Sequence, residues 1–209
     1  MLKGSVLIHP GYFPTISQMA VVAQAENIVF EAEDNYQKQT YRNRTLISQA
    51  QGTLLLNVPI LHTKGVRKKY VEVQVENQES WQSHHLKSLQ TAYRTSPYFE
   101  YYEDEITHLF TDPVTSLFDH NVKIHQELCE LLGIDTPFIF TEEFEKEPKG
   151  IIDARNSIDA KVKLDITFPK YIQVFQERNG FYPNLSILDL LFNEGPNAIS
   201  YLEKIKLPY

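Results

Sequence analysis

The stretch HPGYFPT at residues 9–15 decides the expected fold, because it separates an apolar run from a helix-like segment. Residues 5–9 have the composition of a buried strand, and residues 16–25 show the pattern of a short helix. Residues 27–31 return as a second apolar strand. A strand, a polar turn, a helix and a second strand predict a compact α/β unit, with His9 where the first strand ends.

The carboxyl end of a strand is where open α/β sheets bind ligands, since loops and helix N-termini present backbone N–H groups there. A second stretch, QKQTYRNR at residues 37–44, follows the second strand and brings Lys38, Arg42 and Arg44 among hydrogen-bonding side chains. The two stretches together predict a site for an anionic ligand.

The charge distribution supports this interpretation. The chain carries 20 Lys and Arg against 27 Asp and Glu, yet residues 35–71 hold seven cations and no acid. The seven are Lys38, Arg42, Arg44, Lys64, Arg67, Lys68 and Lys69. Such a block attracts phosphate or carboxylate groups, although a solvated basic hairpin has the same composition. Two arginines on either side of Asn43 favour shaped recognition over a solubility face.

Bulk composition fits one domain of 209 residues, with a sheet-rich part at 1–76 and a mainly helical part at 77–209. Cys129 is the only cysteine, which excludes an internal disulfide framework and a zinc site of several thiolates. The N-terminal apolar run is too short for a signal peptide, and no run approaches the roughly 20 residues that span a bilayer. We therefore expect a cytoplasmic protein, and its net charge of −7 argues against nucleic-acid binding.

The rest of the chain adds more strands and then helices. Strand composition recurs at residues 45–48, 53–58, 70–75, 138–140 and 170–175, with a hairpin around Gly52. Helical patterns recur at residues 81–95, 98–110, 114–132, 185–192 and 197–204. Residues 142–165 are charged and rich in turns, which predicts a surface excursion. The expected fold is α/β, with a mixed sheet, an N-terminal strand–helix–strand unit and a C-terminal helical lobe.

His9 is the first candidate catalytic residue, because few structural reasons place a histidine at the end of an apolar strand. It can transfer a proton, act as a fixed donor to a developing negative charge, or simply brace the turn. Asp34 is the second candidate, since it either orients His9 or Lys38 or caps a turn.

Trp81, His85 and Tyr93 lie at spacings of four and eight residues, so they share one helix face. Such a face packs at the edge of a core or binds a sugar. The histidines show no metal-binding spacing, because His120 and His125 are five residues apart and no His-Glu-x-x-His occurs. We therefore expect no metal ligands and leave the cofactor unknown. No Gly-x-Ser-x-Gly elbow or Walker-type phosphate loop is present, which argues against the common hydrolases and P-loop proteins.

Five motifs are spread along nearly the whole chain. They are His9 with Tyr12-Phe13-Pro14, Lys38-x-Thr40-x-x-Asn43-Arg44, Trp81-x-x-x-His85-Leu-Lys-Ser with Tyr93, Pro97-Tyr-Phe99, and PNLSILDLLFNEGP at residues 183–196. In these motifs the sequence resembles the WbqC-like family of bacterial proteins. It departs from the usual opening at Pro10-Gly11, where Gln-Pro is common, and at Thr15, where Trp is common.

The resemblance implies a role in surface-polysaccharide biosynthesis, because the family name comes from gene clusters for that process. Members are expected to modify sugars there by attaching an amino-acyl or acyl group. We therefore expect a transferase that acts on an anionic activated donor or on a nucleotide- or lipid-linked amino sugar. The catalytic candidates are His9 and Asp34. The substrate-binding candidates are Tyr12, Gln37, Lys38, Arg42, Asn43, Arg44, Trp81, His85 and Tyr93.

Two alternatives stay open. One is a nucleotidyltransferase-like enzyme, because that superfamily also has a histidine-containing turn between a strand and a helix, although no second histidine completes its usual pair here. The other is a non-catalytic binding or scaffold protein of a biosynthetic complex. A scaffold predicts a large exposed apolar patch, whereas an enzyme predicts a concave polar pocket. A small-molecule ligand is the expected partner, and a homo-oligomer is left open.

Overall fold

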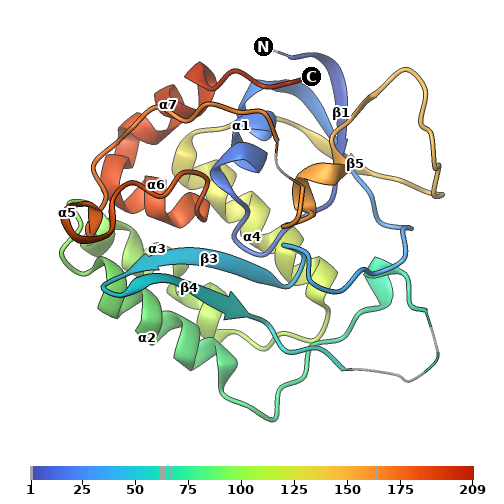
Figure 1. The fold of residues 1–209 in the computed structure, drawn as a ribbon. Helices are drawn as coiled ribbons and strands as arrows, with labels where there is room; N and C mark the ends of the chain where they lie inside the picture. Colours follow the sequence, from blue (N-terminus) through green and yellow to red (C-terminus); the bar gives the residue numbers. More distant parts are fainter. Residues whose placement is uncertain (1, 62–64, 66, 163) are drawn as a thin grey trace.

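Four parallel strands form the main sheet, in the order β5-β2-β1-β6 (Figure 1). They are β1 (Leu2–Ile8), β2 (Ala25–Phe30), β5 (Phe138–Phe140) and β6 (Ile152–Asp153). The computed structural model describes residues 2–61, 65, 67–162 and 164–209. Val6 lies at the middle of this sheet, since it pairs with Ile28 on one side and with Ile152 on the other.

Helix α1 (Ile16–Gln24) connects β1 to β2 and is buried on almost every side. Eight of its nine residues are buried, so its apolar residues are not confined to one face. Its buried Ser17, Gln18 and Gln24 are hydrogen-bonded through their side chains. It packs against α6 (Ile187–Glu194) and α7 (Ala198–Lys204), so the C-terminal part of the chain covers the N-terminal unit.

The remaining elements surround this unit. An antiparallel hairpin is formed by β3 (Arg44–Gln49) and β4 (Gly52–Asn57), and Figure 1 shows it beside α2. The helices are η1 (Tyr70–Glu72), α2 (Trp81–Tyr93), α3 (Phe99–Thr111), α4 (Leu117–Leu132), η2 (Arg155–Ile158), α5 (Gln176–Asn179) and η3 (Gly195–Asn197). One hydrophobic cluster extends from Leu2 to Ile205. No helix in the described part of the chain has the length and hydropathy to cross a membrane.

The predicted α/β class, the strand–helix–strand unit and the helical lobe are confirmed. The predicted strand at 70–75 is wrong. Its alternation correctly marks Val73 and Val75 as buried, but the backbone forms the 3₁₀ helix η1 and then only isolated bridges to Ile60 and Ser116. Alternating burial therefore does not require a ladder of paired strands.

Two further predictions in the second half need correction. Residues 170–175 form no strand, because the backbone there bends so that Gln173 reaches Tyr171, Tyr182 and Asp189 through its side chain. Residues 142–165 are more than a surface excursion, since they contain β6 and η2. The predicted basic loop at 62–69 lies partly outside the described residues, as does its Lys64.

A buried carboxylate connects the helical lobe to the hairpin. Asp189 on α6 is fully buried, and its Oδ1 accepts a hydrogen bond from the Tyr93 hydroxyl at 2.8 Å. Its Oδ2 accepts from the Tyr171 hydroxyl and from Gln173 Nε2, at 2.5 and 2.9 Å. The Tyr93 oxygen in turn accepts from the backbone N–H of Ser48 in β3, at 3.1 Å.

Replacing Tyr93 by Phe should lower the free energy of unfolding by about 1–3 kcal/mol, because Ser48 N–H and Asp189 each lose a buried partner. The change is measured by urea denaturation. Tyr101→Phe is the matched control, since Tyr101 is 75% exposed and its loss should change stability by less than about 0.5 kcal/mol. Equal effects of the two substitutions would show that the buried network contributes no net stability.

Candidate active site

His9 follows β1 directly, so it lies at the carboxyl end of the main sheet, where the sequence places it. β2 and β5 lie on one side of β1, while β6 lies on the other. The strand order therefore changes direction at β1. In open α/β sheets this topological switch point is where the crevice for a ligand forms.

The turn after His9 is packed too closely to be a free loop. Gly11 has no room for a side chain, because a Cβ there would lie 3.0 Å from both Gln18 Oε1 and Ile158 Cδ1. Gln18 also donates from Nε2 to the carbonyl oxygen of His9 at 2.5 Å. The first residues of α1 and the 3₁₀ helix η2 thus hold the backbone that carries His9.

Three side chains from separate segments meet at this point. His9 Nε2 lies 2.6 Å from an Arg42 guanidinium nitrogen and 3.1 Å from Asp34 Oδ2. The same Arg42 nitrogen donates to Asp34 Oδ2 at 3.0 Å. His9 is 3% exposed and Arg42 only 1%, so these contacts are shielded from bulk water. Asp34 Oδ2 therefore contacts both His9 and Arg42.

Burial and charge fix the ionisation of this group. Burial lowers the pKa of His9 to about 4, against the opposing effect of its hydrogen bond with Asp34, and the Arg42 charge lowers it further. Burial raises the pKa of Asp34, but the contacts with His9 and Arg42 outweigh it, so this pKa is lowered overall. At neutral pH the site therefore contains a neutral imidazole beside a carboxylate and a guanidinium.

These side chains line a cavity of about 370 Å³. Its lining consists of His9, Asp34, Gln37, Thr40, Arg42, Phe144, Asp153, Arg155, Asn156, Ile158, Asp159 and Val162. The sequence predicted four of these as site residues, namely His9, Asp34, Gln37 and Arg42. Of the others, Thr40 lies in the predicted basic motif, and the rest lie in or after β6 or, for Phe144, after β5. The signal of this second group was missed because β6 has only two residues and lacks a recognisable strand pattern.

Arg155 builds the second wall of this cavity. Its Nε and one terminal nitrogen donate to Asp153 at 2.9 and 2.7 Å, and its other terminal nitrogen lies 3.3 Å from Glu31. The carbonyl oxygens of Glu145 and Lys146 accept from the same guanidinium. Every nitrogen of Arg155 thus has a partner, which makes it a structural cation.

Two polar atoms of the cavity lack such partners among the described residues. His9 Nδ1 and Arg42 Nε are both buried without a hydrogen bond. Buried polar atoms are nearly always paired with protein or with water, so these two atoms are exceptions, and both belong to residues that line the cavity.

The N-terminus of α1 does not serve this cavity, contrary to the sequence-based expectation. The backbone N–H groups of Ile16, Ser17 and Gln18 donate to Leu185 O, Asn184 Oδ1 and Thr15 Oγ1. Since all three are engaged, they are not available to an anion.

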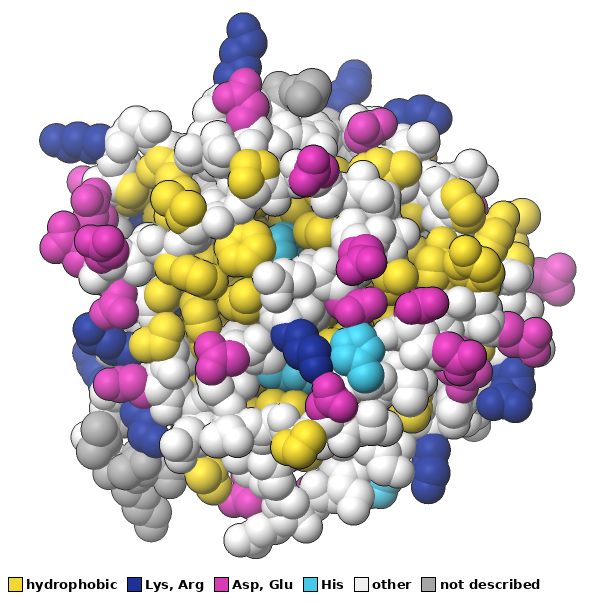
Figure 2. Space-filling model, turned by 180° about the vertical axis from the view of Figure 1, so that it is seen from behind, with side chains coloured by type: hydrophobic (Ala, Val, Ile, Leu, Met, Phe, Trp, Pro, Cys, Tyr) yellow, Lys and Arg dark blue, Asp and Glu magenta, His cyan; other side chains and the backbone are white. Residues whose placement is uncertain are grey.

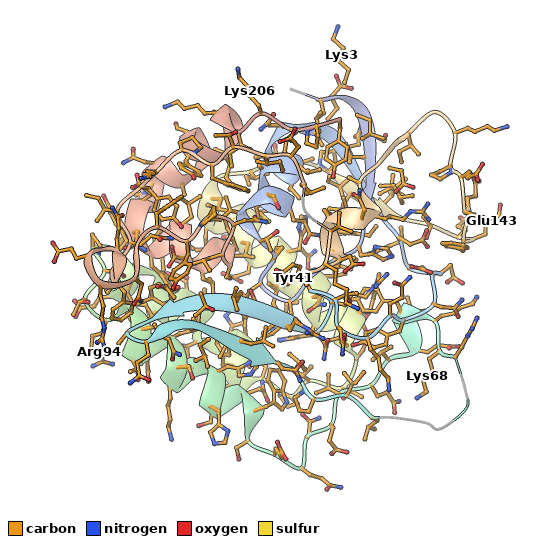
Figure 3. The ribbon with its side chains drawn as sticks, in the orientation of Figure 1. Lys3, Tyr41, Lys68, Arg94, Glu143 and Lys206 are labelled. Atoms are coloured by element: carbon orange, nitrogen blue, oxygen red, sulfur yellow. The ribbon has the colours of Figure 1, made fainter. Side chains whose placement is uncertain are left out.

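Of the cations in the basic block that the structure describes, only Arg42 lines the cavity. Lys38 is exposed, and neither it nor Arg44 lines the cavity. Lys69 pairs with Glu33. In Figure 3 Lys68 lies at the periphery of the molecule, far from the centrally placed Tyr41, and Figure 2 shows acidic and basic side chains interspersed on the rear face. The block is therefore not one positive surface.

Several other candidates lie in the packed interior. Asn43 donates from Nδ2 to Val58 O at 2.9 Å, which closes the end of the hairpin. The Tyr12 hydroxyl contacts His85 Nδ1 at 2.8 Å, and Trp81 packs edge-on against both rings. Trp81, His85 and Tyr93 are all buried, as expected for the core-edge face considered from the sequence. None of these candidates lines the cavity.

The structure also bears on the reactivity of Cys129 and on metal binding. Burial raises the pKa of the Cys129 thiol to about 12, so it is protonated at neutral pH and is a poor nucleophile. Within the described ranges no three His, Cys, Asp or Glu side chains converge as metal ligands.

A family model described as the WbqC-like protein family matches residues 9–165 and 149–201. The chain belongs to the WbqC-like protein family. Every residue that lines the cavity lies inside the part matched by the family. A relative of the chain is the uncharacterized protein Rv1507c of Mycobacterium tuberculosis (strain ATCC 25618 / H37Rv), which is 23% identical over 227 residues, covering 96% of this chain and 98% of that protein. No solved structure matches.

Acidification should destabilise the protein well above pH 4. Burial lowers the pKa of His9, His85, His120 and His125 to about 4 each, whereas an unfolded chain has histidines near 6.5. Between these values the unfolded state binds more protons, so stability falls as the pH decreases, by up to about 1.4 kcal/mol per pH unit for each histidine.

Urea denaturation at pH 7, 6 and 5 measures this slope. Replacing the buried His125 by Gln should reduce this pH dependence of the free energy of unfolding by up to about 1.4 kcal/mol per pH unit, because one group that binds a proton only in the unfolded chain is removed. Equal unfolding free energies at pH 7 and pH 5 would contradict the neutral, buried state of these rings.

Proposed function

We propose that this protein is a cytoplasmic transferase of bacterial surface-polysaccharide biosynthesis. It acts on a nucleotide- or lipid-linked amino sugar with an anionic activated donor, and it transfers an acyl or amino-acyl group. The observation that carries this proposal is the neutral, buried His9 held between Asp34 and Arg42 in a polar cavity at the carboxyl end of the sheet. Strongly shifted ionisable groups in such a cavity are typical of catalytic sites.

The composition of the lining supports a sugar ligand better than a free polyanion. Three carboxylates, those of Asp34, Asp153 and Asp159, stand against the two guanidinium groups of Arg42 and Arg155. Such a balanced lining suits a molecule with hydroxyl groups and charges of both signs. An amino sugar bound to a phosphate leaving group is a molecule of this kind.

Individual side chains suit the parts of this substrate. Asp159 has one oxygen bonded to the backbone N–H of Lys161, which leaves its other oxygen for a hydroxyl or amine. Phe144 is 46% exposed although it lines the cavity, and aromatic faces pack well against the C–H face of a sugar ring. The apolar side chains of Ile158 and Val162 continue this wall.

His9 is the residue closest to the expected chemistry. In acyl transfer a nucleophile bonds to the carbonyl carbon, negative charge develops on the carbonyl oxygen, and the bond to the leaving group then breaks. A neutral imidazole at the floor of the cavity can assist either by accepting the proton of the nucleophile or by donating a hydrogen bond to that oxygen.

The nucleotidyl-transfer alternative would use the same His9. The lining that the structure describes contains one histidine, so the second member of that superfamily's usual pair is lacking from it. The scaffold alternative would draw on exposed apolar side chains such as Ile139 and Phe140 on the edge strand β5. The polar cavity favours the enzyme.

Replacing His9 by Ala should lower turnover about a hundredfold or more, because both proton transfer and hydrogen-bond donation are lost. Nucleotide-linked amino sugars are first screened by thermal shift, since a ligand at a hundred times its dissociation constant stabilises the protein by about 2.7 kcal/mol. Transfer from acyl-CoA or another activated donor to each stabilising sugar is then followed by mass spectrometry.

His84→Ala is the matched control, because His84 is exposed and does not line the cavity. Near-wild-type turnover in the folded His9→Ala variant would remove His9 from the reaction. Stabilisation by no sugar conjugate, with no transfer product, would refute the proposed function as a whole.

A further inference from the structure

Arg42 and Asp34 require opposite hydrogen-bonding roles of the same His9 nitrogen, Nε2. A guanidinium group can only donate hydrogen bonds, whereas an ionised carboxylate can only accept them. His9 Nε2 lies 2.6 Å from the Arg42 nitrogen and 3.1 Å from Asp34 Oδ2. A single ring nitrogen cannot accept from Arg42 and donate to Asp34 at the same time.

The distances decide between the two arrangements. A proton on Nε2 would point two N–H groups at each other across 2.6 Å, in a place where Arg42 is 1% exposed and His9 is 3% exposed. Asp34 does not need that proton, because Arg42 already donates to the same carboxylate oxygen at 3.0 Å. The tautomer with the proton on Nδ1 lets Nε2 accept from Arg42 across the shorter contact of 2.6 Å, and the Asp34 oxygen at 3.1 Å then receives its hydrogen bond from Arg42 instead.

We propose that Arg42 is a positioning residue that holds His9 in the Nδ1–H tautomer, so that the ring is a hydrogen-bond donor and not a general base. Asp34 then acts on Arg42, which it keeps in place, and only indirectly on His9. This inference rests on the proposed function insofar as the cavity is taken to be the active site.

The tautomer gives chemical meaning to the two unpaired atoms of the cavity. With its proton on Nδ1, His9 has a buried donor without an acceptor, and so does Arg42 at Nε. Both residues line the same cavity. A donor of either kind suits an oxygen that carries or develops negative charge, as a carbonyl or phosphoryl oxygen of the transferred group does.

The reaction step balances without proton transfer to His9. As the nucleophile bonds to carbon or phosphorus, the electron pair of the double bond moves to the oxygen that faces the two donors. When the bond to the leaving group breaks, the leaving group takes that bond's electron pair and the double bond re-forms. His9 keeps its proton throughout, and the proton of the nucleophile goes to solvent.

Nitrogen NMR of protein with ¹⁵N-labelled histidine tests this directly, since protonated and unprotonated ring nitrogens have well-separated shifts. The His9 signals are assigned by their loss in His9→Gln. In the wild type at pH 7 we expect a protonated Nδ1 and an unprotonated Nε2. Arg42→Met should move the proton to Nε2, because Asp34 is then the remaining partner, whereas Asp34→Asn should leave it on Nδ1.

A protonated Nε2 in the wild type would overturn the inference, as would a proton that moves to Nε2 in Asp34→Asn. If Arg42→Met does not fold, Arg42→Lys takes its place, since lysine keeps a cationic donor and should retain the Nδ1 proton. The measurement needs no substrate. An inactive protein with the Nδ1 proton would therefore refute only the proposed function, and an active enzyme with the Nε2 proton would refute only the role of Arg42.

Discussion

The structure depends on how the turn at residues 9–15 satisfies its buried backbone carbonyl groups. A buried carbonyl without a donor costs free energy comparable to a lost hydrogen bond, so each one needs a partner from elsewhere in the chain. The donors come from six side chains or backbone groups, namely Gln18 to His9, Tyr70 and Asn121 to Pro10, Thr45 and Ser186 to Phe13, and Ile187 to Pro14. The turn thereby ties the first strand to the hairpin, to α4 and to α6, and it holds His9 in one position.

This requirement connects several of the sequence motifs, although they lie far apart along the chain. Ser186 shows it best, because its hydroxyl donates to Phe13 O and also caps α6 by accepting from Leu188 N–H. Asn43 and Tyr93 similarly complete backbone hydrogen bonds of the hairpin. Polar motif residues that look like ligand contacts in the sequence thus serve mainly to satisfy a buried backbone.

Local pattern was enough to predict the first unit and the place of His9, because strand, turn and helix signals there agree within about twenty-five residues. The partners of His9 follow from tertiary packing. Arg42 is 33 positions away, and its contact with His9 depends on how the hairpin folds back on the turn. The low pKa of the imidazole results chiefly from burial, which no spacing of charged residues reveals. The far wall of the cavity could not be predicted, because β6 pairs with β1 at only two residues. Such a short strand is defined by its pairing with β1 and has no strand pattern in its own sequence.

The weakness of β6 has a consequence for how the cavity opens. β1 and β2 are paired at five positions, whereas β1 and β6 are paired at two. Beyond these pairs, Arg155 contacts Glu31 after β2, and the backbone N–H of Tyr41 donates to Ile158 O. Segments with few backbone pairs open by local unfolding at a fraction of the global free energy. The wall made of Asp153, Arg155 and Asp159 should therefore exchange its amide hydrogens sooner than β2 does.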